Sequence, residues 1–189
     1  MILVGVPPNR MATNVQFDVH SKRFALRIAT MIDARLIWYK HYHGWAARLI
    51  AELDDPPTWI LEISTIKYYA DAVAAVNRFA YCESVESFDH EQRADEHVAC
   101  IFLRYQSGAI SWATFLSEAG AFADGFGGRH DCEYFYALLN ELEDNEYAQE
   151  VETHQRTEIE CTFSVALSTI RPLYEMFMEY FREYVATQA

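Results

Sequence analysis

The sequence predicts an all-α protein, a single bundle of about seven or eight helices. Apolar residues recur at helical spacing along most of the chain. The 189 residues are 51% hydrophobic and 15% aromatic, which supplies a large core and excludes a disordered protein. Only 7 glycines and 5 prolines are present, too few for a many-turned β fold. Because no linker-like segment divides the chain, we treat residues 1–189 as a single helical domain.

The first half of the chain predicts three helices and one short ambiguous segment. A helix over about 21–39 carries one apolar side, formed by Phe24, Ile28, Met31, Ile32 and Arg35. The next helix starts near Tyr42 and stops before Pro56-Pro57, because proline cannot continue a helix. Residues 59–63 are too short to classify, and an apolar stripe over 66–80 predicts the third helix.

The second half predicts four or five helices with readable ends. The first covers about 89–106, and Gly108 suits the left-handed position just past its end. Ser111 and Asp131 are predicted N-caps of the next two helices, and the glycines of 125–128 form the turn between them. Pro172 interrupts the last apolar stripe, which therefore forms either two helices or one kinked helix.

The N-terminus carries the β candidates and no targeting signal. Residues 2–6 and 14–19 are the only candidate strands, so the fold includes at most one short N-terminal strand. The apolar run 2–6 is too short for a signal-peptide core or a bilayer span, and no other run approaches 18 apolar residues. We therefore expect a cytoplasmic protein that does not enter a membrane.

The charge of the chain is strongly negative and unevenly distributed. A net charge of −13 argues against nucleic-acid binding, because phosphates require a cationic surface. Residues 1–50 have a net charge of +5, whereas residues 51–189 have −18. Residues 131–160 contain ten carboxylates against the single cation Arg156, and a second acidic run covers 83–96.

Two interpretations of the acidic runs remain open. They form either a solvated face that aids solubility or a surface that attracts a basic partner. Carboxylates near the C-terminal end of a helix oppose its macrodipole, so local helix stability explains the run 141–150 poorly. The candidate binding residues are Glu141, Glu143, Asp144, Glu146, Glu150, Glu152, Glu86 and Asp89.

Motifs for chemistry are missing from the sequence. It contains no Glu-x-x-His or H-E-x-x-H metal motif, no G-x-S-x-G nucleophile motif and no phosphate-binding loop. We interpret His41 and His43 as packing and capping residues, and the polar residues of 89–97 as an exposed helix face. The sequence thus predicts no enzyme activity, no cofactor and no metal.

One stretch resembles a known family. Residues 45–64 read WAARLIAELDDPPTWILEIS, a helix followed by acidic residues, Pro-Pro, an aromatic residue and an apolar segment. This pattern resembles the helical immunity proteins of bacterial polymorphic-toxin and contact-dependent growth inhibition systems. Residues 108–143 have a similar helix–breaker–helix character. The sequence departs from the family pattern at Ala47, where that pattern has an aspartate.

The resemblance implies a cytosolic inhibitor that binds a toxin domain delivered by a sibling cell. Many such toxins are nucleases with basic clefts, in which carboxylates can take the place of phosphates. The implied partner is therefore a toxin domain, bound by the candidate carboxylates. Two alternatives stay open: a helical enzyme that uses buried carboxylates with His97 or His130, and a small-ligand or metal-binding protein with an apolar groove.

Overall fold

The computed structural model describes residues 17–84 and 86–188, and these form nine α-helices and no strand. The prediction of an all-α bundle is confirmed. The candidate strand 2–6 lies outside the described residues, as does 14–16, and residues 17–19 are not a strand. None of the described helices combines the length and the apolar composition needed to cross a membrane.

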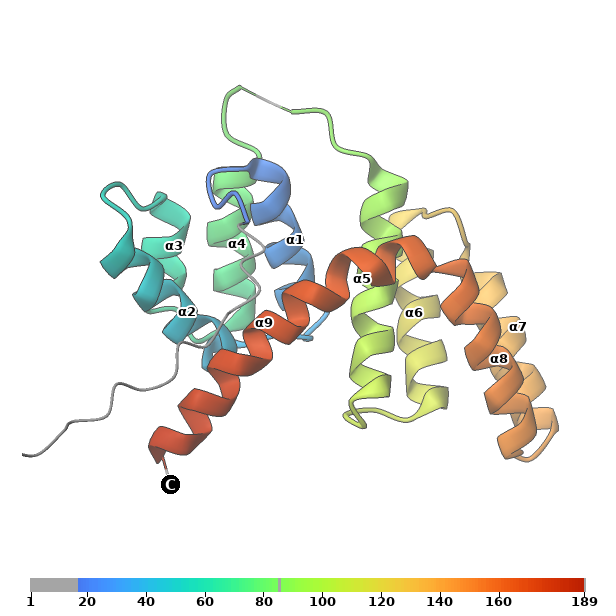
Figure 1. Ribbon diagram of the computed structural model, residues 1–189. Coiled ribbons are helices and arrows are strands. Elements are labelled where there is room, and N and C mark those ends of the chain that lie inside the picture. Colours follow the sequence, from blue (N-terminus) through green and yellow to red (C-terminus); the bar gives the residue numbers. More distant parts are fainter. Residues whose placement is uncertain (1–16, 85, 189) are drawn as a thin grey trace, which may run out of the picture.

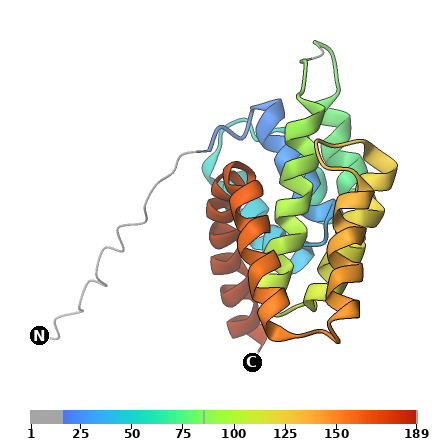
Figure 2. The same ribbon diagram turned by 90° about the vertical axis from the view of Figure 1, so that its right-hand side faces the viewer.

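The nine helices follow one another with short connections, and α9 spans both halves of the bundle (Figure 1). In the first half, α1 packs on α4, and α3 packs on α2 and α4. In the second half, α5 packs on α6, α6 on α7 and α7 on α8. Helix α9 crosses from α8 over α5 to α2, as both views show (Figures 1 and 2). The helices are α1 Lys22–Asp33, α2 Tyr39–Glu52, α3 Thr58–Ile63, α4 Tyr69–Ala80, α5 His90–Gln106, α6 Trp112–Phe126, α7 Cys132–Asp144, α8 Gln149–Thr162 and α9 Ser164–Gln188.

Helix α5 is the central element of the bundle. It contacts α1, α6 and α9, and every residue from Glu96 to Leu103 is buried. A helix buried on all sides cannot keep its polar residues in water, so each must find a partner inside the protein. One continuous hydrophobic cluster surrounds α5 and extends from Val19 to Phe177.

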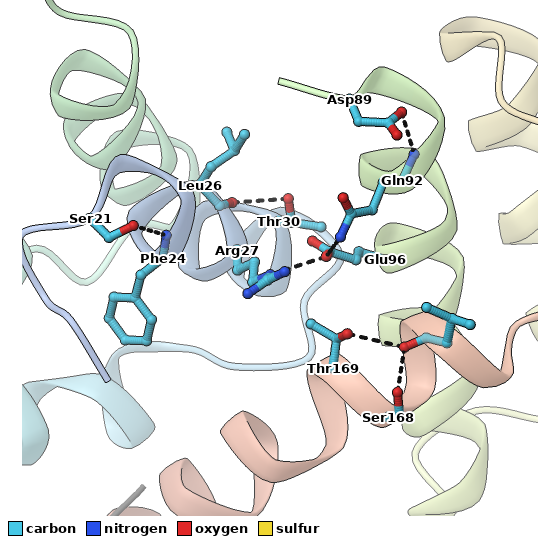
Figure 3. A network of polar contacts seen from close by, with 11 residues as sticks. Ser21, Phe24, Leu26, Arg27, Thr30, Asp89, Gln92, Glu96, Ser168 and Thr169 are labelled. Carbon is cyan, nitrogen blue, oxygen red and sulfur yellow. Dashed lines mark hydrogen bonds and ion pairs between the residues drawn. The ribbon is translucent and has the colours of Figure 1, made fainter. Parts of the chain in front are cut away.

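The buried carboxylate of Glu96 is satisfied by two neighbours (Figure 3). The Nε of Arg27 on α1 donates to Glu96 Oε1 at 3.1 Å, and the side chain of Gln92 donates to the same oxygen at 3.0 Å. Glu96 is 5% exposed and Arg27 is half-buried, so this ion pair is screened less than a surface pair. It fixes α1 against the central helix.

The predicted helix over 21–39 is wrong in its second half. Helix α1 ends at Asp33, and Arg35 adopts a φ of +57°. The amide of Leu36 donates to Met31 O at 2.9 Å, and that of Arg35 donates to Ile32 O at 3.0 Å. These two bonds form a Schellman motif with Arg35 in the position that glycine normally takes. Leu36 and Ile37, in the connection that follows this break, are both buried in the core.

The last apolar stripe is interrupted at Phe163 rather than at Pro172. Phe163 is buried beside Phe135 and separates α8 from α9, whereas Pro172 lies inside α9. Proline in a helix leaves the carbonyl four residues earlier without its amide partner. That carbonyl belongs to the exposed residue Ser168, where water can replace the missing donor. Next to it, the hydroxyls of Ser168 and Thr169 both donate to Val165 O (Figure 3).

The predicted caps of the second half are confirmed, whereas α2 and α4 begin at Tyr39 and Tyr69 instead of near 42 and 66. Ser111 and Asp131 accept bonds from the amides three residues on, and so cap α6 and α7. Gly108 and Gly127 have φ values of +75° and +55°, the left-handed conformation that glycine adopts without strain.

We expect Arg27→Met to destabilise the protein by about 2–3 kcal/mol, because it leaves a buried carboxylate without its cation. Replacing both partners in Arg27→Met/Glu96→Met should restore most of this loss, since neither charge is then buried. Urea unfolding of the three proteins measures both effects. A double variant no more stable than Arg27→Met would show that the ion pair does not set this energy.

Candidate functional site

The candidate carboxylates of 141–150 gather where α7 ends and α8 begins, at one end of the bundle (Figures 1 and 2). Their side chains are exposed, and so is Tyr147, which is 58% exposed between them. No carboxylate of this group lies within 4 Å of a basic nitrogen of the described residues. We call this surface the acidic tip; it consists of Glu141, Glu143, Asp144, Glu146, Tyr147 and Glu150.

The turn of the acidic tip holds two residues in an unfavourable backbone conformation. Glu146 and Tyr147 have φ values of +52° and +60°. The amide of Tyr147 donates to Leu142 O at 2.9 Å, and that of Glu146 to Glu143 O at 2.9 Å. Helix α7 thus ends in the same Schellman motif as α1, with Glu146 in the glycine position. A side chain there costs about 1 kcal/mol relative to glycine.

The dipoles of α7 and α8 act in opposite ways on the carboxylates of the tip. Glu141, Glu143 and Asp144 stand in the last turn of α7, which has no basic residue, so they oppose its dipole. Glu150 stands in the first turn of α8, where a carboxylate is favourable. The prediction that helix stability does not explain these residues therefore holds for the first three only.

Four of the eight predicted carboxylates lie apart from the tip or contact another helix. Glu141 belongs to the tip, but it accepts from the side chain of the buried Gln155 on α8 at 2.9 Å. Glu152 is half-buried, and the hydroxyl of Tyr105 donates to it. Asp89 is the N-cap of α5 and accepts from the amide of Gln92 at 3.1 Å. Glu86 is exposed in the connection before α5, at the end of the bundle opposite the tip (Figures 1 and 2). The structure therefore does not bring Glu86 and Asp89 together with the other candidates.

His41 and His43 serve the packing of α2, as the sequence predicts. Nδ1 of His41 accepts from the amide of Trp38 at 3.3 Å, and the ring stacks on Phe181 at a centroid distance of 4.5 Å. Burial lowers the pKa of His41 to about 4, so the ring is neutral and free to accept. Nε2 of His43 lies 2.9 Å from Ile66 O, where it donates in the matching tautomer.

His97 and His130, the candidates for an alternative active site, are also packed against aromatic rings. His97 stacks on Phe122 at 3.7 Å, and His130 lies 5.0 Å from Tyr134 and 5.3 Å from Phe163 between ring centroids. Burial lowers the pKa of His97 to about 4, and burial also raises the pKa of Asp33. Although His97 Nδ1 is 3.9 Å from Asp33 Oδ2, the neutral imidazole forms no ion pair there at neutral pH.

A second surface, which sequence reasoning missed, is a groove of about 570 Å³. The groove lies between the α1–α2, α3–α4 and α5–α6 connections, and the middle of α9 closes it. Its wall is largely aromatic and its rim carries cations. We call it the aromatic groove; its principal lining residues are Arg35, Trp38, Tyr39, Lys67, Tyr68, Tyr69 and Phe181.

The cations of the groove lie over its rings. The guanidinium of Arg35 is 4.7 Å from the ring centroid of Tyr69, and Lys67 Nζ is 5.7 Å from that of Tyr39. Lys40 does not line the groove, but its Nζ lies 4.7 Å from the ring centroid of Trp38, which does. The sequence did carry a signal, because all the excess basic charge lies in residues 1–50. It gave no indication that residues 35–40 and 67–69 would face each other.

Comparison with family models, with curated proteins and with solved structures found no match to this chain. Its function is therefore argued from the acidic tip and the aromatic groove alone.

We expect His97 to make stability depend on pH. Its pKa is about 4 in the folded protein and near 6.5 when unfolded, so the unfolded state binds the proton first as pH falls. The stability from neutral His97 is complete above pH 6.5 and is lost towards pH 4, at up to about 1 kcal/mol per pH unit. Asp33, with its raised pKa, acts in the opposite direction. Urea unfolding between pH 7 and 4.5 should show a smaller pH slope in His97→Gln; an unchanged slope contradicts the assignment.

Proposed function

We propose that this chain is an immunity protein that neutralises a bacterial toxin domain, and that the acidic tip is its toxin-binding surface. The observation that supports this most is the exposed, uncompensated charge of the tip. Five exposed carboxylates and an exposed tyrosine share the end of α7 and the start of α8, and no basic nitrogen of the described residues is within 4 Å of these carboxylates. Such a surface attracts a basic partner and repels an acidic one.

The composition of the tip suits a protein interface. Tyrosine supplies a large contact area with few rotatable bonds, and it is frequent among the residues that dominate binding energy. The carboxylates around Tyr147 would meet the lysines and arginines with which a nuclease holds phosphates. A toxin nuclease would thus be blocked by occupation of its basic cleft.

The backbone of the tip supports the same conclusion. Glycine at position 146 would remove strain, yet the chain carries glutamate there and tyrosine at the next positive-φ position. At Gly108, where α5 ends in the same motif, glycine is used. The strained turn projects one carboxylate and one aromatic ring from the end of α7, which favours a role for these side chains outside folding.

Neutralising the tip should slow toxin capture. We expect Glu143→Gln/Asp144→Asn/Glu150→Gln to reduce the association rate with the toxin domain encoded beside this gene by at least tenfold at low salt. The salt dependence of the rate should become shallower, and protection of toxin-expressing cells should be lost.

The matched control is Glu175→Gln/Glu179→Gln/Glu183→Gln, which removes the same charge from exposed positions on α9. It should keep protection and most of the association rate. Equal effects of the two triple variants would show that only net charge matters, and a gene neighbourhood without a toxin would argue against an immunity function.

Position 146 offers a separate test. Glu146→Gly should raise the free energy of unfolding by about 1 kcal/mol, because it removes strain at a φ of +52°. The same substitution should weaken toxin binding, and Glu146→Gln should weaken it without the gain in stability. Urea unfolding and toxin affinity are measured on both. A stabilised Glu146→Gly with unchanged affinity would remove Glu146 from the interface.

A further inference from the structure

We infer that the aromatic groove binds a small organic anion with a flat aromatic body. This inference is independent of the immunity function, because it concerns a different surface and a different ligand. The volume of about 570 Å³ lies within the range of small-molecule sites. Such sites combine a largely apolar wall with a few converging polar groups, and the groove has both.

The lining of the groove is positively charged in an acidic protein. The chain has 28 carboxylates and only 15 lysines and arginines. Arg35 and Lys67 line the groove, and no carboxylate of the described residues lies within 4 Å of them. Exposed cations such as Arg23 and Arg182 also lack such a partner, but they do not line the groove. No Asp or Glu lines the groove.

One cation of the groove is already paired within the protein, and the other two remain available to an anionic ligand. Arg104, the paired cation of the lining, donates to Glu118 and to Ala34 O. Its charge is therefore compensated within the protein. Arg35 and Lys67 lie over the faces of Tyr69 and Tyr39, and the guanidinium of Arg35 also partly opposes the burial that raises the pKa of Asp33. A ring attracts a cation but does not neutralise it, so an anion at the rim would gain two charge-assisted hydrogen bonds.

The backbone favours the same use of Arg35. With a φ of +57°, this position is one where glycine avoids strain, and the chain carries arginine instead. The arginine makes one weak bond, from Nη2 to the hydroxyl of Tyr69 at 3.4 Å. One weak hydrogen bond does not offset the strain of this backbone conformation. Binding of an anion between Arg35 and Lys67 would explain why an arginine occupies the position.

The exposed rings indicate the shape of the ligand. Trp38 is 45% exposed and Tyr68 is 60% exposed, and both line the groove. Flat surfaces of this kind stack on an aromatic ring of a ligand. A protein ligand with acidic charge would have to approach a chain of net charge −13, whereas a small anion meets only the cations of the rim. The observations therefore favour a small molecule.

The test uses the full chain and two fluorescent probes of the same shape. 8-Anilinonaphthalene-1-sulfonate carries the anion, and N-phenyl-1-naphthylamine lacks it. We expect the sulfonate to bind with one-to-one stoichiometry and at least tenfold more tightly than the amine. Tyr68→Ala should weaken both probes, because it removes a stacking surface.

The decisive variant is Arg35→Gly/Lys67→Gln. It should weaken binding of the sulfonate at least tenfold and binding of the amine less than threefold. Because glycine suits the φ of position 35, the midpoint of urea unfolding should not fall. The control Arg23→Gln/Arg182→Gln removes two exposed cations that do not line the groove and should change neither affinity.

Several results would overturn the inference. They are equal affinity for the two probes, binding of several sulfonates per chain, or equal losses in the decisive and control variants. Toxin protection is measured separately: a tip variant that loses protection but still binds the sulfonate separates the two proposals. If the tip variants keep protection while the groove variants lose the sulfonate, the immunity proposal fails and the groove stands.

Discussion

The burial of α5 on all sides is the constraint from which the rest of the arrangement follows. A central helix must be covered by neighbours, and α1, α6 and α9 provide that cover. Because residues 96–103 are all buried, Glu96 has to be neutralised from a neighbouring helix, and Arg27 on α1 does this. The ion pair therefore joins α1 to the central helix. His97 is also buried on α5, but it needs no counter-charge because it stays neutral and stacks on Phe122.

Outside this core, the ends of three helices share one backbone conformation. Three helices end in the same hydrogen-bonded motif, α1 at Arg35, α5 at Gly108 and α7 at Glu146. Only the middle one carries the residue that the backbone favours. The other two expose a charged side chain, one on the rim of the aromatic groove and one at the acidic tip. Backbone strain and surface charge thus point to the same two positions, although they are independent properties.

The sequence predicted what depends on local periodicity and missed what depends on tertiary contact. Caps such as Ser111 and Asp131 are local hydrogen bonds, and Gly108 is a local conformational preference, so both were readable. The end of α1 was not, because apolar residues continue past Asp33 and only the core decides that Leu36 and Ile37 turn inward. The sequence left open whether Pro172 ends a helix or lies within one, and its exposed position is what allows it to lie within α9. The acidic tip was located from the charge run, but the distance of Glu86 from it required the fold.

The aromatic groove shows why net charge is a poor guide to a single site. A value of −13 excludes a large cationic surface, yet Arg35 and Lys67 line one groove and Lys40 lies beside it over Trp38. Each lies over an aromatic ring, which keeps it in place without neutralising it. A cation without a carboxylate partner is common on this protein, and Arg23 and Arg182 are examples. What distinguishes Arg35 and Lys67 is that they share one groove with exposed aromatic rings, and that no Asp or Glu lines it. The combination of these features, rather than the net charge, separates a binding site from a solvated surface.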